Sequence, residues 1–273
     1  MAKVILSSTY DDDYLFYVPI TAWVWKYFGF DAVVFVPKGG TPLFKLVLDY
    51  TLSTTNFVYF EPSNVYSPAR LAQCSRLFAG CMDFIAEDEY CLLGDIDMIP
   101  LSDYFCRDFD KINYFGHDLT GFEHIPMCYV GMTKQAWKSV MGLSQANAVS
   151  AQPLLRATFI DHMLRAMEQY TDNWGLDQDI LTDRMRGYGL ENCNAIPRGL
   201  HGPSHAIGRV DRSYGFDVWM ENPIDAHLPR PGFEESSFAD ISALLGRVFP
   251  SSDFRWLAEY REKYVRSRSA SSL

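Results

Sequence analysis

The stretch YCLLGDIDMIP at residues 90–100 places the strongest constraint on the fold. A short apolar run leads through Gly94 to two carboxylates, Asp95 and Asp97, with one residue between them. An apolar run that stops at acids is typical of a buried parallel strand ending at a site. Residues i and i+2 share one face of a strand, so we expect both carboxylates to point the same way. Pro100 should end the segment because it cannot donate to a sheet.

The D-x-D pair predicts a cation site. Two carboxylates this close repel each other unless a cation lies between them, and their oxygens suit Mg²⁺ or Mn²⁺. The alternative is a solvated turn after a strand, because acids are common at strand ends and a D-x-D pair alone is a weak signal. The order of the features on either side therefore decides between the two interpretations.

Strand-like and helix-like segments alternate up to this stretch. Strands are expected at residues 3–8, 31–36 and 57–60, and helices at 14–28, 41–50 and 67–80, with Asp12 or Asp13 as the first N-cap. This alternation predicts an α/β fold with a mainly parallel central sheet flanked by helices. Ligands bind beyond the carboxyl ends of the strands in such sheets. The acidic loops 11–13 and 95–97 should therefore lie at the same edge.

The second half is less regular. Strands are expected at residues 112–115, 128–132 and 194–198, and helices at 133–141, 153–170, 177–186 and 251–265. We expect a main domain over residues 1–215 and a C-terminal extension over 216–265 that packs on it. A basic, serine-rich tail over 266–273 is expected to be disordered.

Composition excludes several classes of protein. A chain of 273 residues that is 48% hydrophobic can bury a full core. The net charge of −10 argues against a nucleic-acid binder. No apolar run is long enough for a transmembrane segment, and MAKVILSS lacks the layout of a signal peptide, so a soluble, cytoplasmic protein is expected. The six cysteines include no C-x-x-C pair, so we expect reduced thiols rather than disulfides or a zinc site.

Five segments in order carry a resemblance to a known family. They are VILSSTYDDDY, SPARLAQCSRLF, LLGDIDMIPLSDYF, WGLDQDILTDRM and LHGPSH. Together they resemble the GT-A glycosyltransferases, and most closely the glycogenin-like retaining family that includes bacterial lipo-oligosaccharide galactosyltransferases. The similarity spans roughly residues 3–210. It implies a GT-A, Rossmann-like fold with residues 1–215 as the catalytic domain.

The resemblance also implies an activity and its residues. The activity is metal-dependent transfer of a hexose or pentose from a UDP- or GDP-linked nucleotide sugar to a glycan or other hydroxyl acceptor, with retention. The positions implied in nucleotide-sugar binding are Ser7, Asp11, Tyr14, Arg70, Asp95 and Ile96. Asp177 and Gln178 fall at the donor-sugar contacts near the anomeric carbon and are the implied catalytic residues.

The metal site implied by the resemblance consists of Asp95, Asp97 and a histidine, with Mn²⁺ or Mg²⁺ as the cofactor. His201 is our choice for the histidine, and His205 is its rival. The family usually continues into a Lys-Pro-Trp stretch whose lysine contacts phosphate. Here the sequence runs HGPSHAIGRVDRSYG, with Arg209 or Arg212 as possible substitutes.

The D-Q-D stretch also has a purely structural interpretation, because acids are favoured in the first turn of a helix. That alternative accounts for Asp179 but gives Gln178 no role, whereas an amide can accept a hydrogen bond from a sugar hydroxyl. We therefore assign function to Asp177 and Gln178 and structure to Asp179. Arg76, further along the helix of Arg70, is expected to be solvated. No partner is evident for the remaining histidines, His117, His124, His162 and His227.

Two other function classes remain open, a phosphohydrolase and a catalytically silent binding module. A phosphohydrolase of the haloacid dehalogenase type also has D-x-D at a strand end, but on the first strand and with Thr or Val two residues later, where this chain has Ile99. A nucleotidyltransferase would need a glycine-rich loop after the first strand, which STYDDDY does not provide. A catalytically silent module that binds a sugar nucleotide or glycan is the second open alternative.

Overall fold

The computed structural model describes residues 2–116, 124–143, 152–197, 208–252 and 254–271. Its main sheet has seven strands in the order β3-β2-β1-β4-β7-β6-β8. Their bounds are β1 Ala2–Ser7, β2 Phe30–Pro37, β3 Asn56–Phe60, β4 Tyr90–Leu93, β6 Ile112–Gly116, β7 Val130–Thr133 and β8 Cys193–Pro197. Only β7 runs antiparallel to its neighbours, β4 and β6. The predicted fold class, an α/β protein with a mainly parallel sheet, is confirmed.

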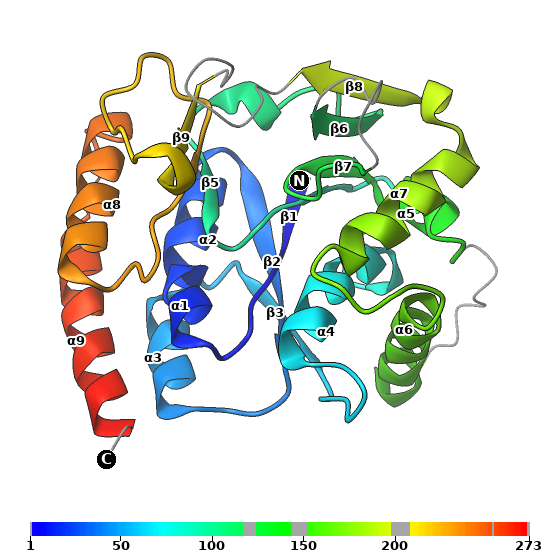
Figure 1. Ribbon diagram of the computed structural model, residues 1–273, viewed down its shortest axis with the longest axis horizontal. Helices are drawn as coiled ribbons and strands as arrows, with labels where there is room; N and C mark the ends of the chain where they lie inside the picture. The colour runs from blue at the N-terminus through cyan, green and yellow to red at the C-terminus, as the bar shows by residue number, and fades with distance from the viewer. Residues whose placement is uncertain (1, 117–123, 144–151, 198–207, 253, 272–273) are drawn as a thin grey trace.

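Helices cover both faces of this sheet (Figure 1). One face carries α1 Asp12–Leu15, α2 Tyr17–Tyr27, α3 Pro42–Tyr50, α8 Glu235–Val248 and α9 Arg255–Ser271. The other carries α4 Pro68–Ser75, the 3-10 helix η1 Arg76–Cys81, α5 Lys134–Val140, α6 Gln152–Met167 and α7 Leu176–Tyr188. Along β1, Val4 and Leu6 face the first layer and Ile5 faces the second, as the period of a strand requires.

The N-terminal helix begins at a different residue from the one predicted. Asp11, not Asp12 or Asp13, is the N-cap of α1, and its side chain accepts from the backbone N–H of Asp13 at 2.9 Å. Pro19 falls in the first turn of α2, where its missing N–H costs no helical hydrogen bond, and this accounts for the break after α1. Thr41 and Ser67 are the N-caps of α3 and α4, at the residues where the sequence predicts that these two helices start.

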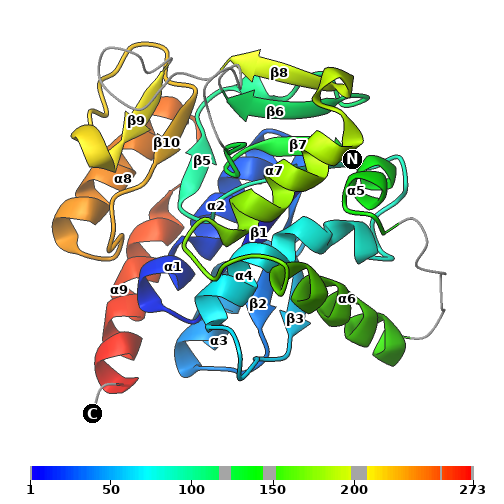
Figure 2. The same cartoon turned by 45° about the vertical axis from the view of Figure 1, so that its right-hand side comes forward.

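A small second sheet follows the D-x-D segment. It contains β5 Met98–Pro100, β10 Asp225–His227 and β9 Arg209–Asp211, with β10 in the centre. β10 runs antiparallel to β5 and parallel to β9. Figure 2 shows β5, β9 and β10 lying together. The domain division expected after residue 215 falls between two strands of this sheet, so the segment that contains β10 is continuous with the main domain.

The C-terminal helix is longer than predicted. The tail expected to be disordered from residue 266 is helical as far as Ser271, where α9 ends. Arg268 on this helix lies 2.7 Å from Asp12, and the Tyr264 hydroxyl donates to the Asp12 carbonyl at 2.9 Å. These contacts fix the helix against the start of α1. The C-terminal helical extension of the predicted fold is present, and α8 and α9 pack on the face of the main sheet that carries α2.

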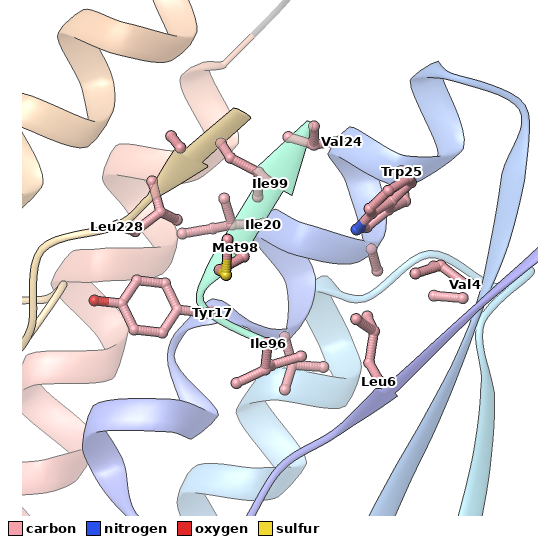
Figure 3. Packing of buried hydrophobic residues seen from close by; sticks show 14 of the residues in the cluster. Val4, Leu6, Tyr17, Ile20, Val24, Trp25, Ile96, Met98, Ile99 and Leu228 are labelled. Carbon is pink, nitrogen blue, oxygen red and sulfur yellow. The ribbon is translucent and has the colours of Figure 1, made fainter. Parts of the chain in front are cut away.

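The core between the sheet and α2 reaches directly under the D-x-D segment. Ile96 is buried among residues of β1 and α2, with Met98 and Ile99 beside it (Figure 3). All six cysteines are free thiols. In the part of the chain that the structure describes, no helix has both the length and the apolar character to span a bilayer.

Candidate functional site

The two carboxylates of the D-x-D pair lie beyond the strand rather than on it. β4 ends at Leu93, and the chain turns so that the N–H of Met98 donates to the Asp95 carbonyl at 3.1 Å. Asp95 bonds to Arg76, whereas Asp97 contacts a different set of cationic side chains. The expectation that both acids share one strand face is therefore wrong, because the turn gives each its own surroundings.

Asp97 is the centre of a cluster of charged side chains. Its Oδ2 atom lies 2.7 Å from Nη1 of Arg212, 3.3 Å from Nε of Arg230 and 3.4 Å from Nε2 of His227. Burial by itself would raise the pKa of this carboxyl. The hydrogen bond from His227 and the charges of all three cations outweigh burial and hold the Asp97 pKa well below its usual range. Asp97 is thus ionised and neutralised within the protein.

His227 is a member of the site that sequence reasoning missed. It lies on β10 between two acids, with Nδ1 3.4 Å from Asp211 and Nε2 3.4 Å from Asp97. Burial lowers its pKa, but hydrogen bonds to both acids raise the pKa to about 9, so His227 is protonated at neutral pH. The expectation that this histidine has no partner is wrong. The available signal was the number of charged residues in the short segment DAHLPR.

The structure distinguishes the two arginines proposed as substitutes for the family's lysine. Arg209 forms a buried, bidentate pair with Asp225, with Nη2–Oδ2 at 2.6 Å and Nε–Oδ1 at 3.1 Å. Arg212 instead reaches Asp97 and also donates to the carbonyl of Leu228 at 2.6 Å. Arg212 therefore belongs to the Asp97 cluster. The Arg209–Asp225 pair instead joins β9 to β10, the strands that carry Asp211 and His227.

A second charged group links the D-x-D and D-Q-D segments. Arg76 bonds to Asp95, donates to the Gly94 carbonyl at 2.8 Å and donates to Oδ2 of Asp177 at 2.9 Å. Burial raises the pKa of Asp177, and Arg76 opposes that rise. The expectation that Arg76 is solvated is wrong, because its side chain is buried and paired with the acids of both motifs.

Arg70 lies outside this group. Its Nε is 2.9 Å from Asp172 and its Nη1 donates to Gln73 at 2.8 Å, while its guanidinium lies 5.3 Å from the ring of Trp174. Gln178 follows Asp177 in the first turn of α7, and its N–H donates to Oδ1 of Asp177 at 2.9 Å. The structure thus brings Arg76, rather than Arg70, to the acids of the two motifs.

Asp179 has the structural role assigned to it. Its Oδ2 accepts from Asn173 at 3.1 Å, and its Oδ1 lies 2.9 Å from Nδ1 of His124. These contacts hold the start of α7 against the loop before it. His124, for which the sequence suggested no partner, therefore has one.

The remaining predicted residues lie around the carboxyl ends of β1 and β4. Ser7 ends β1, and Asp11 caps α1. The Tyr14 ring lies 4.7 Å from the guanidinium of Arg230, which joins this loop to the Asp97 cluster. The Ile96 side chain is buried and its carbonyl accepts from the Thr21 hydroxyl at 2.6 Å. β1 and β4 are parallel neighbours, so the acidic loops after them meet at one edge, as predicted.

The described residues do not fit a divalent metal as they are placed. Asp97 already contacts three cations, and Asp95 is paired with Arg76. Within the described ranges, no group of three or more His, Cys, Asp or Glu side chains is arranged to hold a metal ion. His201 and His205 lie outside the described residues.

The accessible members of the Asp97 cluster are its cations. The side chains of Arg212, His227 and Arg230 are 16%, 23% and 28% exposed, whereas those of Asp97 and Asp211 are each 6% exposed. The acids therefore lie beneath the cations and orient them. These partly exposed cations lie at the carboxyl edge of the sheet beside the acidic loop 11–13, whose Asp13 interacts with Arg230, and cations of this kind can bind an anionic group.

Comparisons with known proteins give structural neighbours only. No protein-family model matches the chain, and no curated protein sequence matches it. It is similar to two solved structures of the glycosyltransferase GlyE of Streptococcus pneumoniae TIGR4, at 15% and 14% identity and TM-scores of 0.39 and 0.46. The alignments cover 72% and 97% of this chain but 46% and 64% of the GlyE chains.

A third solved structure is the galactosyltransferase LgtC in complex with donor and acceptor sugar analogs. It is 13% identical with a TM-score of 0.47, and the alignment covers 94% of this chain and 99% of that one. All three neighbours are glycosyltransferases, the class that the sequence segments resemble. At these scores the likeness identifies no substrate, so function is argued from the site.

Proposed function

We propose that this protein is a glycosyltransferase that moves a hexose or pentose from a nucleotide sugar, UDP- or GDP-linked, to the hydroxyl of a glycan or other acceptor. The observation that carries the proposal is the cationic group Arg212, His227 and Arg230, oriented by buried acids at the carboxyl edge of β1 and β4. A diphosphate is the part of a nucleotide sugar that such a group recognises.

The reaction explains why cations are needed there. The bond between the anomeric carbon and the diphosphate oxygen breaks, and its electron pair leaves on the phosphate. The acceptor oxygen bonds to that carbon and gives its proton to the leaving diphosphate. Fixed guanidinium groups stabilise the developing charge at the leaving group without rearranging. Arg212 and Arg230 are fixed in this way by Asp97.

Asp177 and Gln178 are the proposed catalytic residues at the sugar. The start of α7 holds them beside Asp95, since Arg76 bonds to both Asp95 and Asp177. Asp177 is buried, whereas Gln178 is partly accessible. Because Gln178 is the accessible residue of the two, we assign its amide oxygen to the electron-poor anomeric carbon, a role in keeping with transfer with retention.

The divalent ion predicted from the sequence remains a prediction. Its proposed ligands are Asp95, Asp97 and His201, and Mn²⁺ or Mg²⁺ would supply further positive charge at the diphosphate. In the structure Asp95 is paired with Arg76, and Asp97 contacts Arg212, Arg230 and His227. No step above therefore depends on the ion.

A thermal-shift panel of UDP- and GDP-linked hexoses and pentoses, with and without Mn²⁺, tests the proposal. A true donor at about 100 times its Kd should stabilise the fold by about 2.7 kcal/mol. Hydrolysis of the stabilising donor should then release the nucleoside diphosphate. Stabilisation without hydrolysis would indicate the catalytically silent sugar-nucleotide module, and the absence of any stabilisation would overturn the proposal.

A further inference from the structure

Trp174 is an exposed aromatic residue beside the proposed catalytic helix start. Its side chain is 65% exposed, and it lies three residues before Asp177 and four before Gln178. A chain of three residues spans at most about 11 Å. The indole is therefore within about one or two sugar rings of the residues proposed to act at the anomeric carbon.

The turn that carries Trp174 is held rigidly. Oδ1 of Asn173 accepts from the N–H of Gly175 at 2.6 Å, and Nδ2 of Asn173 donates to the Thr171 carbonyl at 3.2 Å and to Asp179 at 3.1 Å. These bonds fix the backbone on both sides of the indole. A binding group held in this way loses little conformational entropy when a ligand arrives.

Arg70 covers one side of the indole. Its guanidinium lies over the ring at 5.3 Å and is itself held by Asp172 at 2.9 Å and by Gln73 at 2.8 Å. A cation over one face of an aromatic ring fixes the plane of that ring. Since the side chain remains mostly exposed, the ring presents its other face to solvent as an oriented apolar surface.

We propose that Trp174 is a stacking platform for a sugar ring of the acceptor. The inference rests on the proposed function and extends it, because it identifies the acceptor as a saccharide. The C–H face of a pyranose is apolar and its rim carries hydroxyls, so an aromatic plane bordered by hydrogen-bonding groups matches it. Asp172, whose side chain is 53% exposed, and Gln178 at the helix start supply a carboxylate and an amide beside the ring.

Trp219 provides a matched comparison within the same chain. It is 72% exposed and lies under the guanidinium of Arg247 at the same distance, 5.3 Å. Arg247 also bonds to the carbonyls of Val218 and Met220, so this pair closes a loop against α8. Trp219 is remote in sequence from the D-Q-D segment, and it has no assigned part in the site.

The test uses lactose, maltose and cellobiose as probes, titrated into the full-length protein and followed by saturation-transfer NMR. At least one disaccharide should bind the parent protein, and Trp174→Ala should weaken that binding by about tenfold or more. Trp174→Phe should retain most of the affinity, because it keeps an aromatic plane. Trp219→Ala should bind like the parent, and circular dichroism of every variant confirms its fold.

Three results would overturn the inference. They are the absence of binding by all three disaccharides, unchanged affinity in Trp174→Ala, or an equal loss in Trp219→Ala. A loss of UDP-sugar affinity in Trp174→Ala would place the indole at the donor and would also overturn the acceptor assignment. Donor hydrolysis by the parent protein needs no acceptor, so a failure of the proposed function would be recognised separately.

Discussion

Arg76 donates from Nη2 to Oδ2 of Asp177 at 2.9 Å, and both side chains are buried. The same guanidinium bonds to Asp95, so one cation joins the two acidic motifs of the sequence. Asp177 starts α7 and Asp95 follows β4. The relative position of the proposed sugar contacts and the D-x-D turn therefore depends on Arg76.

Replacing Arg76 should destabilise the protein strongly. In Arg76→Ala the Asp177 carboxylate keeps its burial but loses its cation, and breaking a buried ion pair costs about 3–5 kcal/mol. The free energy of unfolding, measured by urea denaturation, should fall by this amount. Arg70→Ala is the control, because its partner Asp172 is 53% exposed, and exposed pairs contribute about 0–1 kcal/mol. Similar losses in the two variants would contradict the assignment.

The sheet and its helices could be predicted because their signals are local. A buried parallel strand is an apolar run, and caps such as Thr41 and Ser67 act on the next few residues. The burial of Arg76 had no such signal, because its partners Asp95 and Asp177 lie 19 and 101 residues away in the sequence. A helix expected to continue to Gly80 predicted a solvated arginine instead.

Most of the cation cluster could not be predicted, because its contacts are distant in sequence. β5, β9 and β10 have three residues each, too few for a period to be recognised. Pairing of β10 with β5 places His227 beside Asp97, and no local pattern indicates that pairing. The D-x-D and D-Q-D motifs pointed to the acids that Arg76 joins, whereas the places of Arg76, Arg230 and His227 required the tertiary structure.

Removal of the Asp97 carboxylate should also lower stability. Asp97→Ala leaves Arg212, Arg230 and protonated His227 close together without their shared counter-ion, which we expect to cost about 3 kcal/mol. The melting temperature should fall clearly below that of the parent. Asp103→Ala, which removes an exposed acid from the same region, should melt near the parent value. A parent-like melting temperature for Asp97→Ala would show that Asp97 is not a structural counter-ion.

The accessible arginines of the cluster should carry nucleotide binding. Arg230→Ala and Arg212→Ala should each weaken UDP or GDP binding by roughly tenfold, the loss expected for a charge-assisted contact to phosphate. Isothermal titration calorimetry measures the affinities. Arg247→Ala removes a cation of α8 that holds the neighbouring loop instead, so this variant should bind nucleotide like the parent. If all three variants bind alike, the cluster is not the diphosphate site.

The stereochemistry of transfer tests the role given to Gln178. Product formed from an α-linked donor should retain the α configuration, as read from the anomeric coupling by NMR. Gln178→Ala should reduce kcat by roughly 100-fold, a typical loss for a polar group acting at the transition state, with a parent-like melting temperature. An inverted product would remove Gln178 from this role and require a carboxylate base beside the acceptor.

The divalent ion predicted from the D-x-D pair is tested by nucleotide affinity. Asp95 is the more accessible of the two acids, with a side chain 33% exposed against 6% for Asp97, so it is the acid that an ion can reach first. If an ion joins Asp95 to the diphosphate, UDP should bind the parent protein more tightly with Mn²⁺ than with EDTA, because the ion removes the repulsion between carboxylate and phosphate. In Asp95→Asn this difference should disappear, while the EDTA affinity should be kept or improved since one negative charge is lost. Equal affinities for the parent with Mn²⁺ and with EDTA would contradict the ion, and nucleotide binding would then depend on Arg212 and Arg230 alone.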